Sequence, residues 1–234
     1  MKKNSPKISI IIPVLNEETY IAKLLQYVQE SSSAKNIHEI LVVDGGSTDD
    51  TAEIASDFGA VVLQSKQGRA KQMNYGAERA KGQIFYFLHA DTFPPKNFDK
   101  HILKAVFNRN EAGCFRMQFD SKSKFLSFFS WFTRINHKLC RGGDQSLFVT
   151  KRLFRKTKGF NERYVIYEDS EFAARLYKRT NFKVLPKRVI TSARKYERNG
   201  TFKLQYYFGV IHLKNLLGAG PDTLYEYYRR KIAS

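Results

Sequence analysis

The stretch Ile8-Ser-Ile-Ile-Ile-Pro-Val-Leu-Asn-Glu17 decides the fold, because a nearly unbroken β-branched run ends in polar residues. A strand without polar alternation is covered on both faces, as in a parallel sheet. Three further runs of this type lie at residues 39–43, 60–63 and 83–88. Helices are expected between them, around residues 21–28, from Asp49 or Asp50 to Phe58, and over 69–81. These four β–α units predict an α/β fold with a Rossmann-like, mostly parallel sheet flanked by helices.

The regular alternation of strand and helix patterns ends after Leu88, and the rest of the chain mixes predicted strands, predicted helices and an aromatic-rich segment. Helices are expected over 97–108 and 169–179, and strands over 113–119, 183–185 and 189–192. The tail predicts two amphipathic helices, 202–217 and 222–232, separated by Gly218-Ala-Gly-Pro221. Because the sequence contains neither an internal repeat nor an obvious linker, residues 1–234 are expected to form a single domain.

Charge is distributed unevenly along the chain. The 234 residues contain 40 Lys and Arg against 22 Asp and Glu, a formal net charge of +18. Residues 1–91 hold 10 basic and 11 acidic side chains, whereas residues 92–234 hold 30 and 11. Such a field attracts nucleotide phosphates, polyanions or an anionic lipid surface, and charge alone does not choose among them. The apolar fraction of 42% excludes an intrinsically disordered chain.

Cysteine usage and the N-terminus bear on the cellular compartment. Cys114 and Cys140 are too few for a disulfide framework or a paired-cysteine metal site, which fits a reducing compartment. The basic N-terminus precedes an apolar run that is short and contains Pro13, unlike a signal peptide. No stretch approaches the ~20 apolar residues of a membrane span. We therefore expect a cytoplasmic protein.

Polar residues stand at the carboxyl ends of three predicted strands, which is where an open α/β sheet binds its ligand. These exits are Pro13 to Glu17, Asp44-Gly-Gly-Ser-Thr-Asp49 and His89-Ala-Asp91. Each alone is compatible with a turn or a helix cap, but their equivalent positions favour a shared site. The sequence lacks Gly-x-Gly-x-x-Gly and Walker loops, which argues against dinucleotide redox chemistry and NTP hydrolysis. Asp91 offers the hard oxygen that Mg²⁺ or Mn²⁺ prefers, with His89 as a softer neighbour.

As a set, these motifs resemble those of the family 2 glycosyltransferases, which are inverting nucleotide-sugar enzymes with a GT-A fold. The resemblance rests on Ser9 to Glu17, Val43 to Thr51, Gly68-Arg-Ala70 with Asn74, His89-Ala-Asp91, Gly142-Gly-Asp-Gln145 and Glu168-Asp169. It covers roughly residues 7–200, and the set is specific although each motif alone is weak. It implies a nucleotide-sugar-binding half at about 7–115, an acceptor and catalytic half at about 116–200, and C-terminal amphipathic helices at about 201–234.

The resemblance also implies a role for each matching residue. Asp169 would be the general base that takes the proton from the acceptor hydroxyl, with Glu168 beside it. Asp44 would contact the base of the nucleotide, and Asp91 would bind the diphosphate through Mn²⁺ or Mg²⁺. The residues implied for donor binding are Pro13, Asn16, Glu17, Asp44, Gly46, Ser47, Gly68, Arg69, Asn74, His89, Ala90 and Asp91, and those for acceptor binding are Gly143, Asp144 and Gln145. A UDP-sugar is the commoner donor in the family, and a GDP-sugar is the alternative.

The sequence departs from the family pattern in two places. His89 stands where the usual Asp-x-Asp has its first Asp, which leaves Asp91 as the principal metal ligand. The Gln-x-x-Arg-Trp motif of processive members is absent, and Ser192-Ala-Arg-Lys-Tyr-Glu-Arg198 is similar to a variant found in a small bacterial subgroup of single-domain transferases. Arg194 or Arg198 is expected to neutralise the leaving diphosphate. Because no transmembrane helices are expected to form a channel, we expect non-processive transfer.

An aromatic and basic stretch, Lys124-Phe-Leu-Ser-Phe-Phe-Ser-Trp-Phe-Thr-Arg-Ile135, allows two interpretations. Its phenylalanines recur at helical spacing, which is typical of core packing. The alternative is an interfacial element on anionic lipid or a wall for a lipid-like acceptor, and the apolar segment 202–217 supports it. With the basic excess, this predicts an enzyme held peripherally at the inner face of the cell membrane. The acceptor stays open among a lipid, a saccharide and a small alcohol.

Two other classes of protein are compatible with parts of the sequence. A catalytically inactive glycan- or lipid-binding relative would keep the fold without the chemistry, and the presence of both Asp91 and Asp169 argues against it. A nucleic-acid-binding protein would explain the basic charge, but carboxylates at three strand ends would repel a phosphate backbone. We therefore expect no specific nucleic-acid partner.

Overall fold

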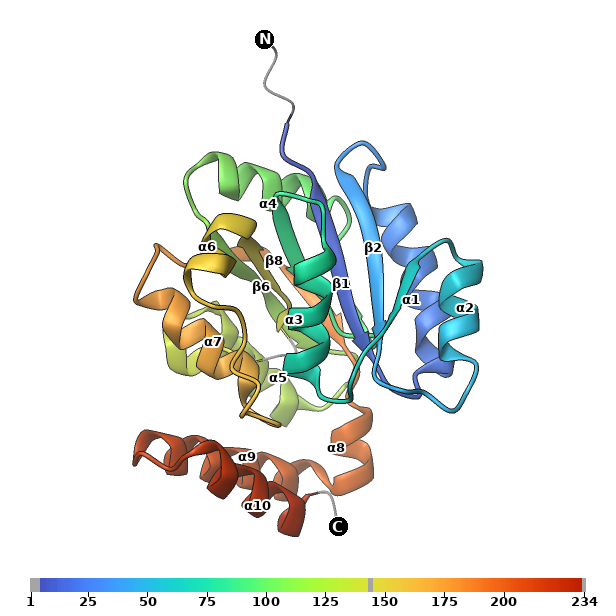
Figure 1. The fold of residues 1–234 in the computed structure, drawn as a ribbon. Helices are drawn as coiled ribbons and strands as arrows, with labels where there is room; N and C mark the ends of the chain where they lie inside the picture. The colour runs from blue at the N-terminus through green and yellow to red at the C-terminus, as the bar shows by residue number, and fades with distance from the viewer. Residues whose placement is uncertain (1–4, 143–144, 233–234) are drawn as a thin grey trace.

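The computed structural model describes residues 5–142 and 145–232, and Figure 1 shows their arrangement. The apolar side chains predicted to lie on one face of the first helix, from Ile21 to Val28, are buried. The first part of the chain contains β1 (Ile8–Val14), α1 (Glu18–Ser31), β2 (Ile37–Asp44), α2 (Thr51–Asp57), β3 (Val61–Gln64), α3 (Arg69–Arg79) and β4 (Ile84–Phe87). The four predicted β–α units are therefore confirmed to within a few residues at each boundary.

The second part of the chain has shorter strands and more varied helices. Its elements are β5 (Thr92–Phe93), α4 (Phe98–Phe107), β6 (Ala112–Phe119), α5 (Lys124–Trp131), 3-10 turns at Phe132–Arg134 and Lys138–Cys140, β7 (Leu147–Thr150), α6 (Lys151–Lys156), α7 (Glu168–Tyr177), β8 (Lys183–Thr191), α8 (Arg194–Asn199), α9 (Thr201–Leu216) and α10 (Pro221–Lys231). Helices α4, α7, α9 and α10 and strand β6 fall where the sequence predicted them. Strands β5 and β7 and helices α6 and α8 were not predicted, because they are too short to show a clear hydrophobic period.

The strands form one sheet in the order β3-β2-β1-β4-β7-β6-β8-β5. β1 to β4 are joined by parallel pairs, as expected for β–α units. β7 pairs antiparallel with both β4 and β6, so the parallel order of the first half ends at β4. β6 and β8 are again parallel to each other. The expectation of a mostly parallel α/β sheet is thus confirmed in the first half, and the second half is mixed.

Strand β8 corrects one expectation. The sequence predicted two strands, 183–185 and 189–192, but the structure has one strand. Leu185 pairs with Phe115 and Arg188 pairs with Arg116, so Pro186 and Lys187 lie in a break of the register. A bulge accommodates a proline, which cannot donate a ladder hydrogen bond. The prediction of two strands was wrong because the bulge at Pro186 and Lys187 interrupts the pairing register without ending the strand.

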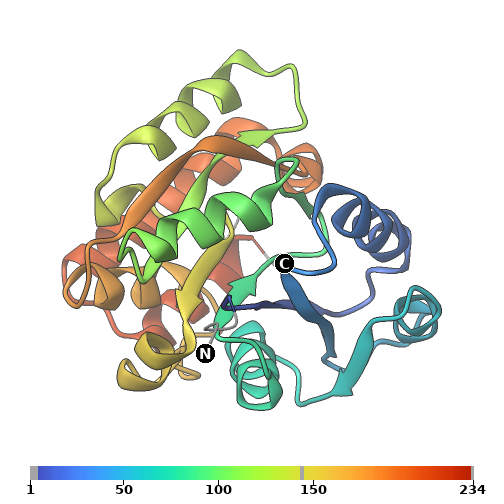
Figure 2. The ribbon, with the colours of Figure 1, turned by 90° about the horizontal axis from the view of Figure 1, so that it is seen from above.

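Helices cover both faces of the sheet, as the view in Figure 2 shows. Ile10 and Ile12 point to a core shared with α1 and α4, whereas Ile11 points to a core shared with α3, α6 and α7. Helix α3 packs closely at Gly76, where a Cβ would lie 2.7 Å from the Ile11 side chain and 2.9 Å from that of Val43. This close approach brings the start of α3 to the carboxyl edge of the parallel strands.

The C-terminal helices form a third hydrophobic cluster at one end of the molecule. Helices α8, α9 and α10 lie across the end of the sheet at which α5 is found (Figure 1). The cluster includes Phe119 from β6, Leu126 from α5, Leu204 and Ile211 from α9, and Leu224 from α10. Among the described residues, no helix is both long enough and apolar enough to cross a membrane.

Candidate active site

The loops after β1 and β2 meet at the carboxyl edge of the sheet. Val14 and Asp44 are paired where these two strands end. The Asn16 backbone N–H donates to the Ser47 hydroxyl at 2.9 Å, and the Thr48 N–H donates to the Asn16 side-chain oxygen at 2.8 Å. Asn16 has a left-handed φ of 54°, which asparagine tolerates better than most residues. The two predicted donor-binding loops are therefore held together by their own polar groups.

The carboxylate of Asp44 organises the loop that follows β2. Asp44 is buried, and it accepts the Ser47 backbone N–H at 3.0 Å and the Ser47 hydroxyl at 2.5 Å. Gly46 lies within this turn with a φ of 97°, a conformation that favours glycine. The predicted contact of Asp44 with the nucleotide base stays a prediction.

Arg194 connects the end of β1 to the end of β4. Its guanidinium donates to both carboxylate oxygens of Glu17, at 2.6 and 2.8 Å, and its Nε lies 3.0 Å from Oδ2 of Asp91. The guanidinium carbon also lies 4.5 Å from the ring centre of Tyr20. Burial opposes the charge, but the hydrogen bond to Glu17 and the charge of Asp91 raise the pKa of Arg194 above its ordinary value. The structure thus brings together Glu17, Asp91 and Arg194, three residues predicted for the site.

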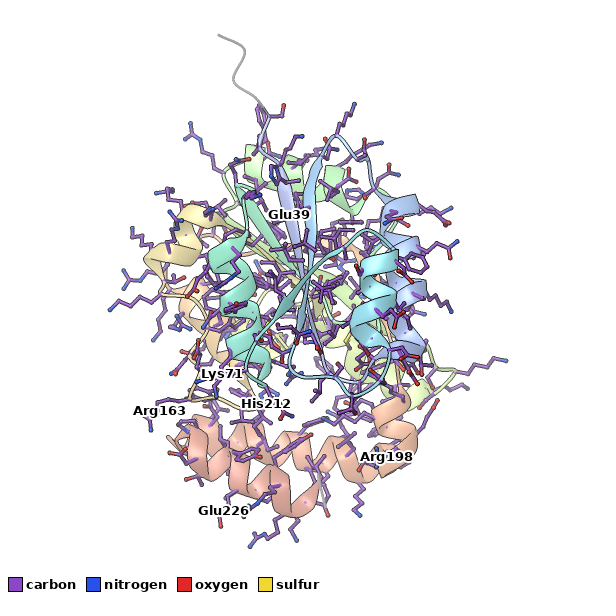
Figure 3. The ribbon with its side chains drawn as sticks, turned by 45° about the vertical axis from the view of Figure 1, so that its right-hand side comes forward. Glu39, Lys71, Arg163, Arg198, His212 and Glu226 are labelled. Atoms are coloured by element: carbon purple, nitrogen blue, oxygen red, sulfur yellow. The ribbon has the colours of Figure 1, made fainter. Side chains whose placement is uncertain are left out.

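Arg198, the other candidate for the leaving diphosphate, lies further along α8 (Figure 3). Its side chain is exposed and forms no hydrogen bond or ion pair with the parts of the chain that the structure describes. Of the two arginines, Arg194 is therefore the one that contacts the predicted donor-binding residues.

The predicted catalytic pair lies in the first turn of α7, and its two carboxylates have different surroundings. Glu168 is fully buried and lies 2.7 Å from Nε of Arg69, an ion pair without hydrogen-bond geometry. Burial raises the pKa of Glu168 to about 7, although Arg69 favours the charged form. Asp169 is 14% exposed, and its Oδ2 lies 3.8 Å from Nε2 of His89. Glu168 thus belongs to the contact between α3 and α7, whereas Asp169 lies on the open side of the helix.

Asp169 and His89 line a small cavity together with the segment before β7. Its other walls include Arg141, Gln145 and the apolar side chains of Phe87, Leu147, Ala173 and Phe182. Gln145 was predicted to bind the acceptor, but its side-chain amide accepts from Arg141 and donates to the Cys140 carbonyl, both at 2.7 Å. Gly143 and Asp144, the other predicted acceptor residues, lie outside the described residues. Gln145 therefore shapes the wall of the cavity.

Arg141 is a residue of the site that the sequence analysis missed. It is buried, and its guanidinium donates to Gln145, to the Thr133 carbonyl at 3.0 Å and to the Ile135 carbonyl. Its own carbonyl accepts the hydroxyl of Ser170, the residue after Asp169, at 3.0 Å. Arg141 therefore fixes the cavity wall to helix α7. Its only sequence signal is its place before Gly142-Gly143, because its partners come from separate segments.

Helix α3 contributes both predicted and unpredicted residues. Gly68 has a φ of 131° just before the helix, at the position that presents Arg69 to Glu168. The Asn74 side chain exchanges two 2.9 Å hydrogen bonds with the Phe160 backbone, which joins α3 to the loop before α7. Its predicted place in the nucleotide pocket stays a prediction. Gln72, which the sequence analysis missed, donates to the carbonyls of Val14 and Val43 at the two strand ends, at 2.7 and 2.8 Å.

The side chains at the carboxyl edge of the parallel strands suit a divalent ion that is bound by one protein carboxylate and by the phosphates of a substrate. Within residues 5–142 and 145–232, no three His, Cys, Asp or Glu side chains gather into a metal cluster. Mg²⁺ is typically bound through one or two carboxylates and the phosphates of a substrate. Asp91 supplies such a carboxylate at the exit of β4, beside the buried Ala90. Asp91 and a substrate diphosphate together therefore suit Mg²⁺ or Mn²⁺.

The sequence is similar to those of known glycosyltransferases. A family model described as "Glycosyl transferase family 2" matches residues 9–185. Glycosyltransferase AglE of Haloferax volcanii is 38% identical over 101 residues, which are 40% of this chain and 33% of AglE. The chain thus spans only a third of the length of this curated relative.

Solved structures bear on the fold. Mannosyltransferase PcManGT from Pyrobaculum calidifontis, solved with GDP-Man and Mn²⁺, has a TM-score of 0.72 and 16% identity, and the match covers 97% of this chain and 70% of that one. S. aureus TarS 1–349 with UDP-GlcNAc has a TM-score of 0.64 and 20% identity, over 80% and 58%. At these identities the likeness shows the fold alone, and this fold is the expected GT-A fold. Since the family model spans most of the sequence, the chain belongs to glycosyl transferase family 2.

Proposed function

We propose that the chain is an inverting, non-processive glycosyltransferase that moves a sugar from a nucleotide-diphosphate sugar to an acceptor hydroxyl, assisted by Mn²⁺ or Mg²⁺. One observation carries this proposal. Arg194 joins Glu17 to Asp91, and His89, two residues before Asp91, lies 3.8 Å from Asp169. Residues suited to the donor and a carboxylate suited to the acceptor therefore share one edge of the sheet.

Donor binding is assigned to the strand exits. The loops after β1 and β2 would hold the nucleoside, and Asp91 would hold the metal ion, which when bound supplies positive charge to the leaving diphosphate. Arg194 would add a second positive charge from the protein. PcManGT was solved with GDP-Man and TarS with UDP-GlcNAc, so both nucleotides occur on this fold. We propose a UDP-sugar as the donor, with a GDP-sugar as the alternative.

Acceptor activation is assigned to Asp169. Its carboxylate would take the proton from the acceptor hydroxyl, and the oxygen would then bond to the anomeric carbon while the bond to the diphosphate breaks on the opposite face. This sequence of events inverts the configuration. Help from a general base is typically worth about 10²–10⁴ in rate. Glu168 would position α7 through Arg69, because its buried carboxylate does not line the cavity.

A thermal-shift screen tests the proposed function. The purified chain would be heated with UDP-, GDP- and other nucleotide sugars, with and without Mn²⁺ or Mg²⁺. A bound donor at about 100 times its Kd should stabilise the fold by about 2.7 kcal/mol. Asp91→Ala should lose the metal-dependent part of the shift. The absence of a shift with every donor would contradict the proposal.

We further propose that the protein is cytoplasmic and attaches peripherally to the inner face of the cell membrane through α5 and α9. These helices touch through Phe125 and Phe202, whose ring centres lie 4.3 Å apart. Phe128 and Trp131 on α5 are 58% and 50% exposed, and Phe202 is 72% exposed. Exposed basic residues accompany them, namely Lys122, Lys124, Arg134, Lys138 and Lys203. Apolar rings flanked by cations are typical of an element that lies in the interface of an anionic bilayer.

This surface also bears on the acceptor. After Phe128 and Trp131 the chain continues through two 3-10 turns to Arg141 and Gly142, which line the cavity beside Asp169. A lipid-like acceptor is therefore favoured over a saccharide or a small alcohol. Sedimentation with anionic vesicles at low salt tests the attachment. The double variant Phe128→Ala/Trp131→Ala should bind less, whereas Phe107→Ala, at an 89% exposed ring on α4, should bind as the unmodified chain does.

A further inference from the structure

Arg194 occupies a position that the proposed donor complex also requires. One guanidinium contacts two carboxylates from different strand exits, Glu17 after β1 and Asp91 after β4. Asp91 is the carboxylate assigned above to the divalent ion. We propose that Arg194 is the resident cation of this carboxylate pair, and that the donor and its metal ion bind by exchanging with Arg194 at Asp91. This inference rests on the proposed function and adds a competition between the chain's own arginine and the metal ion.

The contacts of Arg194 are unequal, which makes such an exchange feasible. Both terminal nitrogens bond to Glu17, at 2.6 and 2.8 Å, and the guanidinium also packs on the ring of Tyr20. The contact with Asp91 is an ion pair in which Nε lies 3.0 Å from Oδ2. A two-point arginine–carboxylate pair is stronger than a single contact. The side chain can therefore release Asp91 and keep its hold on Glu17 and Tyr20.

Charge gives the exchange its direction. The side chains of Glu17 and Asp91 are 17% and 19% exposed, so solvent screens the negative charge of each carboxylate only in part. The Arg194 side chain is 40% exposed, and its positive charge compensates both carboxylates. A divalent ion at Asp91 would repel a guanidinium on the same oxygen, and a diphosphate would attract it. In this scheme Arg194 lowers the affinity for the bare metal ion and raises the affinity for the metal–nucleotide complex.

This predicts effects of opposite sign from one substitution, Arg194→Gln. Without nucleotide, Mn²⁺ should bind the variant about fivefold more tightly than the unmodified chain, at the upper end of what a partly exposed ion pair contributes. With Mn²⁺ present, UDP should bind the variant about fivefold or more weakly, because a charge-assisted contact to the diphosphate is lost. A residue that only holds α8 in place would not produce this reversal.

The experiment measures Mn²⁺ binding by the loss of the free-ion electron paramagnetic resonance signal, and UDP binding by titration calorimetry in the presence of Mn²⁺. Lys156→Gln is the matched control, because it removes one positive charge from an exposed side chain at the end of α6 that has no partner among the described residues. It should leave both affinities unchanged. In an Asp91→Asn background, Arg194→Gln should no longer tighten Mn²⁺ binding. Arg194→Lys keeps the charge and serves as a second variant. Its affinity for Mn²⁺ without nucleotide should lie between that of the unmodified chain and that of Arg194→Gln.

Several outcomes would overturn the inference, and they differ from failure of the proposed function. If Arg194→Gln leaves Mn²⁺ binding unchanged or weakens it in a folded variant, Arg194 does not compete with the metal ion. If the unmodified chain binds UDP equally well with and without Mn²⁺, Arg194 takes the place of the metal, and the exchange is wrong. If the unmodified chain binds no nucleotide under any condition, it is the proposed function that fails.

Discussion

The two halves of the sheet position their side chains by different means. In the half with β1 to β4, the residues predicted for donor binding lie at strand ends or on α3, and parallel pairing brings Glu17, Asp44 and Asp91 to one edge. In the half with β6, β7 and β8, the contributing residues come from turns and helices that are held by long-range contacts. Arg141 and Asp169 lie on different segments, and the Ser170 hydroxyl joins them through the Arg141 carbonyl. The proposed donor site is thus built largely from strand ends that parallel pairing brings together, whereas the proposed acceptor site depends on contacts between segments that are distant in sequence.

The substitution Asp169→Asn separates the two halves with the largest expected effect. An amide has nearly the same shape as a carboxylate but cannot act as a general base, so turnover should fall about 10²–10⁴-fold. Donor binding should be unchanged, because it is assigned to the strand exits. A coupled assay for released nucleotide measures the first quantity, and titration calorimetry measures the second. Normal turnover would place the base elsewhere, and lost donor binding would show that the halves are not separable.

The substitution Gly76→Ala tests the packing of the donor half. A Cβ here would lie 2.7 Å from the Ile11 side chain and 2.9 Å from that of Val43, both in the parallel strands. Overpacking of this kind costs about 1–3 kcal/mol, which should exceed the helix-propensity gain of about 1 kcal/mol from replacing glycine. Chemical denaturation should therefore show a lower free energy of unfolding. A stability at or above that of the unmodified chain would mean that α3 moves freely on the sheet.

The same contrast explains what the sequence could predict. The strand Ile8 to Val14 and the polar residues after three strands were predictable, because each pattern lies within a short stretch of sequence. The carboxyl ends of parallel strands also lie at the same edge of the sheet. The role of Asp169 was predicted only through a resemblance, and it stays a prediction. Arg141 and Gln72 were not predictable, because their partners lie in segments that are distant in sequence. The continuity of β8 through Pro186 was not predictable, because the bulge is defined by the pairing of β8 with β6.

The contact between α7 and α9 gives a pH-dependent prediction for the second half. Tyr167, just before α7, shares a 2.9 Å hydrogen bond with Nδ1 of His212, which lies on the side of α9 that faces the rest of the molecule (Figure 3). Burial lowers the pKa of His212 below its ordinary value of 6.5. The neutral form is therefore favoured on folding. Its contribution to stability is present above pH 6.5 and is lost as the pH falls through the lower, folded-state pKa.

His212→Gln removes this titration. The difference in Tm between pH 7.5 and a pH below the folded-state pKa should be smaller for the variant than for the unmodified chain. The other histidines are present in both proteins and should contribute equally to the pH dependence. The lost Tyr167 hydrogen bond should lower the stability by about 1 kcal/mol at pH 7.5. Equal losses on acidification would mean that the contact between α7 and α9 does not sense pH.

The substitution Gly209→Ala is the counterpart of Gly76→Ala in the C-terminal helices, and it has the smallest expected effect. No atom lies within 4 Å of a Cβ at Gly209, which is exposed on α9. Alanine should therefore stabilise the chain by about 0.4–1 kcal/mol through helix propensity and the unfolded state. The free energy of unfolding, measured beside that of Gly76→Ala, should change with the opposite sign. A loss at Gly209 would mean that the exposed side of α9 is covered in solution, as it would be by a second copy of the chain.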